Sequence, residues 1–268
     1  MWTTERIGPK PFISVDHAGE GELVLFLHGI GGNKRNWHDN LPAFARRFHA
    51  VAWDARGYGE SDDYEAPLDF LDYARDIPRV LDRFGAESAH LVGLSMGGRI
   101  AGAFATMHPE RVRSLVLVDT HLGFRHFTDE GRAEFVRLRR EPLVNGKEPR
   151  DIAEPVARTL VSPNATPEAF GKLVDSLSRL HKESYIKSVE ASVEGDLDVL
   201  FDRIRHPTLV VVGADDRLTP VSMAERIHAM IPDSRLHVIA GAGHLSNIEK
   251  AGEFDRVVLD FLESRRSD

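Results

Sequence analysis

Residues 90–99 read His-Leu-Val-Gly-Leu-Ser-Met-Gly-Gly-Arg, with one serine set among three glycines. Ser95 has Gly93 two residues before it and Gly97 two residues after it. Glycines at both places fit a sharp turn from a strand into a helix, where a side chain would strike the neighbouring backbone. An apolar run at 89–92 and a helical pattern at 100–107 flank the turn as this requires. Such a turn lifts the Ser95 hydroxyl clear of the sheet, as a nucleophile needs.

Further apolar runs, bounded by turn residues, predict strands at 23–27, 50–53, 89–92, 114–118, 208–212 and 236–239, with an edge strand at 12–16. Helical spacing lies between them, at 37–48 and at 68–84 among others, and Pro78 is expected to kink or split the second of these helices. This alternation predicts an α/β fold with a mostly parallel sheet and helices on both faces. Right-handed crossovers place the strand ends on one rim, where we expect His28, Ser95 and Asp119.

The segment from 121 to 195 has no strand pattern. Its predicted helices lie at 129–140, 150–161, 167–180 and 184–193. A helical insertion that leaves the sheet at the functional rim has the position of a lid over the pocket. We therefore expect a core formed by 1–120 and 196–268, and a helical lid, or cap, formed by 121–195.

Composition excludes several classes of protein. The 268 residues contain no cysteine, which rules out disulfides, cysteine nucleophiles and thiolate metal sites. The net charge of -8 argues against a nucleic-acid partner, because phosphate binding needs clustered basic residues. No run of about 18 apolar residues and no signal-peptide pattern is found, so we expect a cytoplasmic protein without a membrane partner. No cofactor and no metal are expected, and the sequence does not predict the oligomeric state.

A serine hydroxyl needs a base beside it, and the base needs an orienting carboxylate. His244 follows the last predicted strand within a glycine-rich loop and reaches the same rim as Ser95. Asp216 is the favoured acid, and Ser95, Asp216 and His244 then follow one of the known chain orders of such a triad. Asp215, next to it in the chain, and Asp119, at the end of a rim strand, remain alternatives.

The oxyanion that forms during acyl transfer needs hydrogen-bond donors. The Met96 N–H lies just after the nucleophile at a helix N-terminus, where the helix dipole favours negative charge. The glycine-rich loop after His28 is expected to supply a second donor, the Ile30 N–H.

Taken together, these motifs resemble the α/β-hydrolase superfamily over nearly the whole chain. The resemblance rests on His28-Gly29, the Asp-x-x-Gly-x-Gly-x-Ser turn at 54–61, the serine motif at 93–97, the stretch 213–220 and Gly243-His244. In that family the acid lies three residues after the glycine that ends its strand, which implies Asp216. The residue after His-Gly supplies an oxyanion donor, which implies Ile30.

Within the superfamily, residues 243–249 resemble the corresponding loop of 3-oxoadipate enol-lactonases and related small esterases, although the proline that follows this loop in those enzymes is absent. The main hypothesis is therefore hydrolysis of a small carboxylic ester or lactone through an acyl-enzyme. The alternative is carbon–carbon bond hydrolysis of ring-cleavage diketones, in a branch that usually carries tryptophan where Leu245 stands. A third hypothesis, from another class, is a ligand-binding receptor built on a hydrolase fold.

Substrate contacts are expected from the mouth of the pocket and from the start of the lid. The candidates are Gly29, Trp37, His121, Phe124 and Arg125. Among them, Arg125 offers a cation for a substrate carboxylate.

Overall fold

The computed structural model describes residues 1–194 and 201–265. Its eight strands form one sheet in the order β1-β2-β4-β3-β5-β6-β7-β8. The strands are β1 (Thr3–Ile7), β2 (Ile13–Ala18), β3 (Leu23–Leu27), β4 (His49–Trp53), β5 (Ala89–Leu94), β6 (Val112–Val118), β7 (Thr208–Gly213) and β8 (Arg235–Ile239). Only β2 runs antiparallel to its neighbours, β1 and β4, and the other pairs are parallel. The prediction of an α/β fold with a mostly parallel sheet is confirmed.

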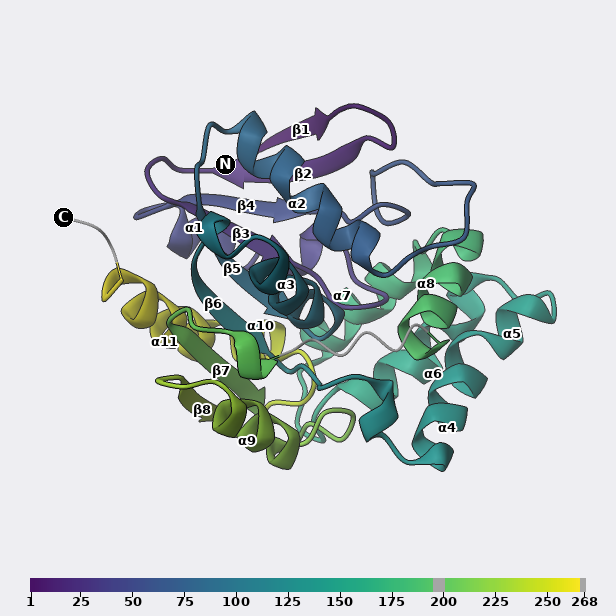
Figure 1. Cartoon of the computed structure of the whole chain (residues 1–268). Helices are drawn as coiled ribbons and strands as arrows, with labels where there is room; N and C mark the ends of the chain where they lie inside the picture. Colours follow the sequence, from purple (N-terminus) through teal and green to yellow (C-terminus); the bar gives the residue numbers. More distant parts are fainter. Residues whose placement is uncertain (195–200, 266–268) are drawn as a thin grey trace.

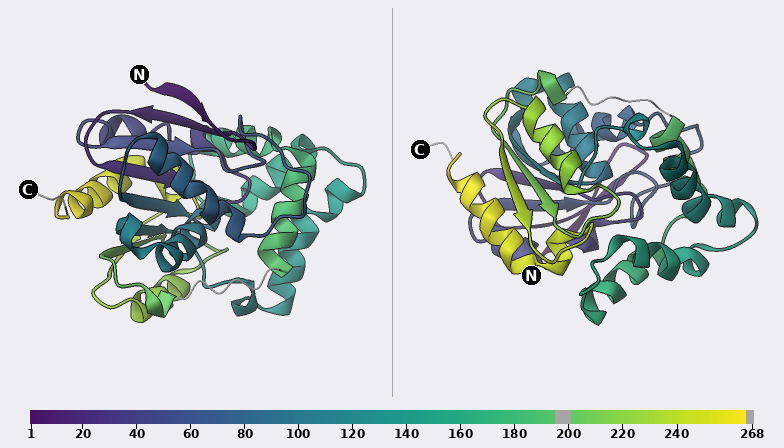
Figure 2. Two further views of the ribbon diagram at one scale, coloured as in Figure 1. Left: turned by 45° about the horizontal axis from the view of Figure 1, so that its top comes forward. Right: turned by 90° about the horizontal axis from the view of Figure 1, so that it is seen from below.

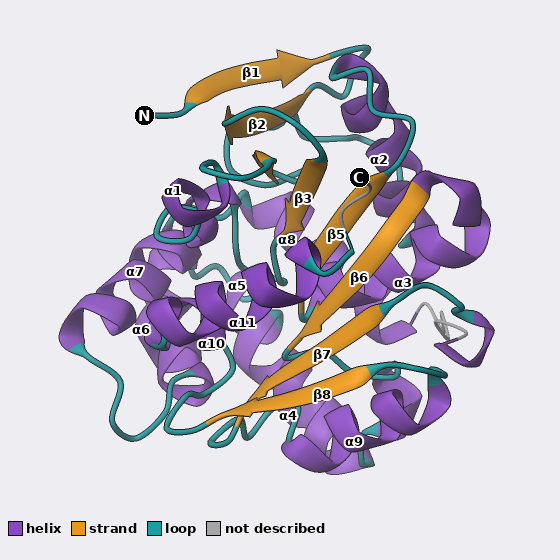
Figure 3. Ribbon diagram, turned by 90° about the vertical axis from the view of Figure 1, so that its left-hand side faces the viewer, coloured by secondary structure: helices purple, strands orange, loops and turns teal. Residues whose placement is uncertain are grey.

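Helices cover both faces of this sheet. The helices of the core are α1 (Leu41–Phe44), α2 (Leu71–Arg83), α3 (Met96–Met107), α9 (Val221–Met230), α10 (Ser246–Glu249) and α11 (Ala251–Glu263). Figure 3 shows α2, α3 and α9 on one face, and α1 and α11 on the other. The core strands are continuous apolar runs because both their faces are covered; every side chain of β3 is buried, for example.

Between β6 and β7 the described chain is helical. The helices there are α4 (Asp129–Arg139), α5 (Glu141–Val144), α6 (Pro149–Leu160), α7 (Pro167–Ser178) and α8 (Lys182–Glu194). Figure 1 shows them gathered at one side of the molecule, and Figure 2 shows them lying beyond the end of the sheet in two further views. The predicted end of the lid at residues 195–196 lies outside the described residues, so the division into core and cap stays a proposal. No helix in the described part of the chain is long and apolar enough to cross a membrane.

Two local predictions were wrong. The expected helix at 37–48 is instead a 3₁₀ helix, η1 (Lys34–Trp37), followed by the short α1. His38 and Asn40, between these two short helices, keep right-handed helical backbone angles. The Asn40 side chain donates to the Asn247 carbonyl at 3.2 Å and to Asp255 at 2.8 Å, both near the C-terminus. The expected edge strand is β2, which has partners on both sides, and the edge is β1. Pro78 lies inside α2, which the structure gives as one helix.

A buried cation fixes η1 to the sheet. The Lys34 Nζ lies 2.9 Å from Glu60, 3.4 Å from Asp16 and 3.6 Å from Asp54, and Lys34 is only 3% exposed. Burial alone would lower the pKa of Lys34, but the carboxylates around it raise the pKa above its usual range. Because Asp16 ends up on β2 and Asp54 directly after β4, this cluster holds the loop after β3 at the rim of the sheet.

We expect Lys34→Met to lower the free energy of unfolding by about 3–5 kcal/mol, because it leaves Asp16 and Asp54 buried without their cation. The control is Lys172→Met, at a half-exposed lysine that pairs with Asp39 on the surface and should contribute less than about 1 kcal/mol. Urea unfolding of the two variants and the parent measures both values. Equal destabilisation by the two variants would contradict the role given to Lys34.

Candidate active site

Ser95 occupies a strained turn between β5 and α3. Its backbone has φ 51° and ψ -111°, in a region that side-chain-bearing residues rarely adopt. A Cβ on Gly93 would lie 2.3 Å from the Gly97 carbonyl oxygen, and a Cβ on Gly97 would lie 2.1 Å from the Leu27 carbonyl oxygen. Both positions therefore require glycine, for the reason expected from the sequence.

His244 and Asp216 form the hydrogen-bonded pair beside this turn. The His244 Nδ1 donates to the Asp216 Oδ2 at 2.8 Å. Asp216 also accepts from the backbone of Leu218 at 2.8 Å and from the backbone and hydroxyl of Thr219 at 2.9 and 2.6 Å, which fixes its carboxylate. Burial alone would lower the pKa of His244, but the Asp216 carboxylate more than offsets this and raises it. His244 thus has the neighbour that a general base needs.

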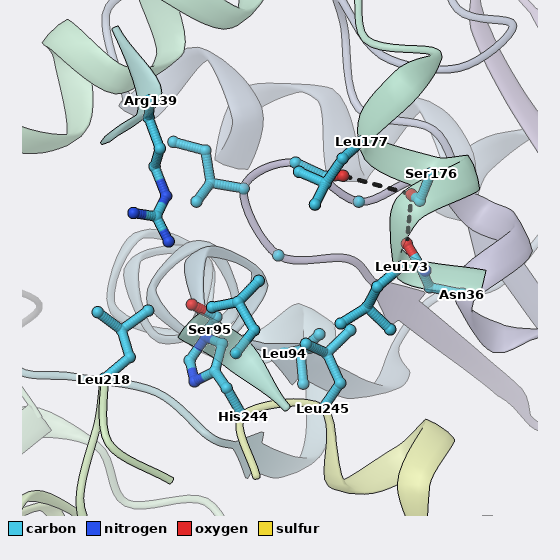
Figure 4. Close-up of a pocket in the computed structure, with 15 residues that line it drawn as sticks. Asn36, Leu94, Ser95, Arg139, Leu173, Ser176, Leu177, Leu218, His244 and Leu245 are labelled. Carbon is cyan, nitrogen blue, oxygen red and sulfur yellow. Dashed lines mark hydrogen bonds between the residues drawn. The ribbon is translucent and has the colours of Figure 1, made fainter. Parts of the chain in front are cut away.

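Figure 4 shows the Ser95 hydroxyl beside the His244 ring, at the floor of one cavity that both residues line. Ser95 Oγ makes no hydrogen bond with any described residue. Catalytic hydrogen bonds are often long before substrate binds, and a rotation of the Ser95 side chain is the motion that would close this one. The arrangement is that of a nucleophile, a base and an orienting acid.

Neither alternative acid contacts His244. Asp119 is fully buried, accepts from the Gly213 N–H at 2.8 Å, and accepts from the N–H and hydroxyl of Ser246 at 3.0 and 2.7 Å. Burial, together with the nearby Asp216, raises its pKa above the usual range. Asp215 is half-buried, and its N–H donates to the Ala242 carbonyl. Asp119 therefore connects the strand ends, and Asp216 faces the histidine.

The loop after β3 forms a tight turn next to Ser95. The Gly32 N–H donates to the Gly29 carbonyl at 2.9 Å, and Gly31 has φ 84°, which is the geometry of a type II turn. Ile30 is the second residue of this turn, and it lines the site together with Met96. The Met96 N–H lies in the first turn of α3 and has no acceptor within the helix. The two predicted oxyanion donors thus border the same space as Ser95.

His28 connects this loop to the residues that follow β4. Its Nδ1 donates to the Gly29 carbonyl at 2.8 Å, and its Nε2 accepts from the Ala55 N–H at 3.1 Å. Burial lowers the pKa of His28 to about 4, so the ring stays neutral and keeps both hydrogen bonds at physiological pH.

Two cavities meet at Ser95. The leucine cavity is lined mainly by Leu94, Leu160, Leu173, Leu177 and Leu245. The phenylalanine cavity is lined by Phe124, Phe127, Phe135, His121, Arg99, Met96 and Ser192. Ile30, Ser95 and Leu218 line both, so a substrate can extend to either side of the nucleophile.

The predicted substrate contacts divide between these places. Gly29 lines the leucine cavity, and His121 and Phe124 line the phenylalanine cavity. Trp37 does not reach either cavity, because it is fully buried in the core between Phe26 and Phe254. Arg125, which was also expected to contact the substrate, does not line either cavity. Its side chain is exposed on the surface, where it donates to His126.

The structure adds three polar residues to the leucine cavity that the sequence interpretation missed: Asn36, Arg139 and Ser176. The Ser176 hydroxyl lies 3.2 Å from the Asn36 Oδ1 and 3.3 Å from the Gly31 carbonyl (Figure 4). Arg139 follows Phe135 by four residues, so both lie on one face of α4. This four-residue spacing was the one sequence feature that could have predicted Arg139 as a cavity residue. In residues 1–194 and 201–265, no group of His, Asp and Glu side chains could hold a metal ion.

Comparison with known proteins agrees with this fold. The model of the alpha/beta hydrolase fold family matches residues 22–251. A 2-hydroxy-6-oxononadienedioate/2-hydroxy-6-oxononatrienedioate hydrolase of Paraburkholderia phymatum is 35% identical over 259 residues, covering 91% of this chain and 88% of its own. A 2-hydroxy-6-oxo-6-phenylhexa-2,4-dienoate hydrolase of Comamonas testosteroni is 32% identical over 94% of this chain and 92% of its own. The enol-lactonase of Burkholderia xenovorans LB400 superposes with a TM-score of 0.84 at 23% identity, covering 97% of this chain and 100% of its own.

We expect Asp216→Asn to reduce kcat by about 10⁴-fold, because the histidine loses its orienting carboxylate. His244 acts as a base only when neutral, so kcat/KM of the parent should fall as the pH drops through its raised pKa. Removing the Asp216 charge should move this acid limb to lower pH. Hydrolysis of p-nitrophenyl acetate across pH 5–9 measures both effects.

Asp119→Asn is the matched comparison, since it removes a buried carboxylate that does not touch the ring. It should lower the melting temperature, because Asp119 holds Gly213 and Ser246, and it should reduce kcat far less than Asp216→Asn does. Loss of turnover in Asp119→Asn alone would show that Asp216 is not the acid.

Proposed function

This chain belongs to the alpha/beta hydrolase fold family, and we propose from that premise that it hydrolyses a carbon–carbon bond next to a ketone in a dienoate substrate. The proposed catalytic residues are Ser95 as nucleophile, His244 as base and Asp216 as orienting acid. Ile30 and Met96 are the proposed oxyanion donors, through their backbone N–H groups.

The observation that carries this proposal is the similarity to the two dienoate hydrolases. They are 35% and 32% identical to this chain over more than nine-tenths of its length. The enol-lactonase, at 23% identity, shares the fold and supports no particular substrate. The relatives therefore favour the carbon–carbon alternative over the ester or lactone hypothesis drawn from the sequence.

The two cavities support the same proposal. The names of the relatives' substrates describe a chain with a carboxylate at its first carbon and a ketone at its sixth carbon, and the dioates of the first relative carry a second carboxylate at the other end. With that ketone at Ser95, the dienoate arm extends into one cavity and the acyl arm into the other. The phenylalanine cavity, with three aromatic rings, suits an apolar acyl arm such as the phenyl group of the second relative's substrate.

The proposed reaction begins with the tautomer in which the 2-hydroxy group has become a ketone. Ser95 Oγ adds to the carbonyl carbon C6 as His244 takes its proton, and the Ile30 and Met96 N–H groups stabilise the oxyanion. Collapse breaks the C5–C6 bond, and the electron pair passes along the conjugated chain to the C2 oxygen. That oxygen takes the proton back from His244. Water, deprotonated by His244, then hydrolyses the acyl-enzyme and releases a carboxylic acid.

Hydrolysis of a small ester or lactone is the second candidate. It uses the same triad and the same acyl-enzyme, and residues 243–249 resemble the loop of enol-lactonases and small esterases. Leu245 also favours it, because the carbon–carbon branch usually has tryptophan there and this chain places an aliphatic side chain in the leucine cavity. A leaving alkoxide needs no conjugated chain, so the substrate distinguishes the two reactions.

We expect the protein to consume 2-hydroxy-6-oxo-6-phenylhexa-2,4-dienoate, seen as loss of the dienol absorbance with release of benzoate. Its kcat/KM should exceed that for p-nitrophenyl esters and enol-lactones measured side by side. Ser95→Ala should abolish turnover and retain binding. Rapid ester turnover with no consumption of the dienoate would overturn the carbon–carbon proposal. Tight binding of these compounds without any turnover would instead favour the hypothesis of a ligand-binding receptor.

A further inference from the structure

Arg139 is a buried guanidinium without a partner. It is the last residue of α4 and is 3% exposed. It makes no hydrogen bond and no ion pair with any residue in 1–194 or 201–265, and its guanidinium carbon lies over the Phe135 ring, 4.1 Å from the ring centre. A buried charge without a counterion is unfavourable, so proteins normally pair it or neutralise it. Burial lowers the pKa of Arg139, yet arginine stays charged in proteins.

The neighbouring arginines on the same stretch are all paired. Arg137 donates two hydrogen bonds to Glu134 at 2.6 Å, and Arg140 donates to Glu190 at 2.6 Å. Glu134, the acid within reach on α4, is thus held by Arg137 on the exposed side of the helix. The chain leaves Arg139 alone as the cation that faces inward.

The guanidinium points into the leucine cavity. Figure 4 shows it directed toward Ser95 and Leu218, while Asn36 and Ser176 lie at the opposite end of the same cavity. Arg139 and Leu218 also line an open surface groove over α4 and α6, together with Arg158 and Arg217. Arg139 therefore borders both this groove and the cavity that Ser95 lines.

We propose that Arg139 binds a carboxylate of the substrate and so makes the enzyme specific for anionic substrates. This inference rests on the proposed hydrolase function and extends it, because it names the residue that recognises the charged end of the molecule. A planar carboxylate can accept two parallel hydrogen bonds from the guanidinium group. The substrate would thus provide the counterion that Arg139 lacks among the described residues. The leucine side chains then cover the hydrocarbon chain between this carboxylate and the bond that is cleaved.

Arg125, the cation expected from the sequence, cannot take this role from its place on the surface. Arg99 faces the other cavity from α3. Its guanidinium carbon lies 4.5 Å from the centre of the Phe70 ring, and its Nη1 donates to the Ser192 carbonyl at 3.4 Å. The leucine cavity is therefore the one that presents an open guanidinium.

The test uses hexa-2,4-dienoate as a probe, which has the carboxylate and the diene but no ketone to cleave. Isothermal titration calorimetry compares it with its uncharged analogue hexa-2,4-dienamide. The parent should bind the dienoate at least about tenfold more tightly than the amide, a difference expected for charge-assisted hydrogen bonds. Arg139→Met should lose that preference, and Arg139→Lys should keep part of it because the charge remains.

Arg137→Met is the control, since it removes a paired arginine from the exposed side of the same helix and should bind the dienoate as the parent does. Arg139→Met should melt at the same or a higher temperature, because methionine fits an apolar cavity, so loss of binding will not reflect unfolding. Equal binding of dienoate and amide by the parent, or unchanged dienoate binding by Arg139→Met, would overturn the proposal. Since the probe is never cleaved, a failure of the carbon–carbon reaction leaves this result readable.

Discussion

The Asp119 carboxylate is the interaction on which the geometry of the rim depends. It stands at the end of β6, in the middle of the sheet, with φ 43°. It accepts from the Gly213 N–H at the end of β7 and from Ser246, two residues after His244. A buried carboxylate that accepts three hydrogen bonds holds its donors in place, because each donor would be left unsatisfied if it moved. The loop of the base is thus tied to the same strand ends that carry the nucleophile and the acid.

This tie allows the strain at Ser95 to persist. The Ser95 N–H donates to the Val118 carbonyl at 2.8 Å, and the Thr120 hydroxyl donates to the Ser95 carbonyl at 2.6 Å. Val118 and Thr120 flank Asp119, so one short segment after β6 fixes both the nucleophile and the base. An unfavourable backbone conformation survives only where the surroundings determine it from several sides, and here they do.

The charges around the site are divided between structure and chemistry. Some buried charges near the rim of the sheet form ion pairs that hold loops in place, as Lys34 does with Asp16 and Asp54. The Asp216 carboxylate accepts hydrogen bonds from Thr219 in its own turn and from His244, so its negative charge lies next to the base. Arg139 alone in the leucine cavity has no such partner among the described residues, which separates it from the structural charges.

Local chemistry of the chain was enough to predict the parallel sheet, the turn at Ser95 and the positions of Ile30, Met96 and His244 at one rim. These follow from apolar runs and from glycines whose neighbours in space are set by the turn itself. Which aspartate lies against His244, and where the side chains of Arg125 and Arg139 lie, depended on the tertiary structure. In both cases the residue types are alike, and the difference is which group from a distant part of the chain packs against them: Ser246 against Asp119, and the residues of the leucine cavity around Arg139.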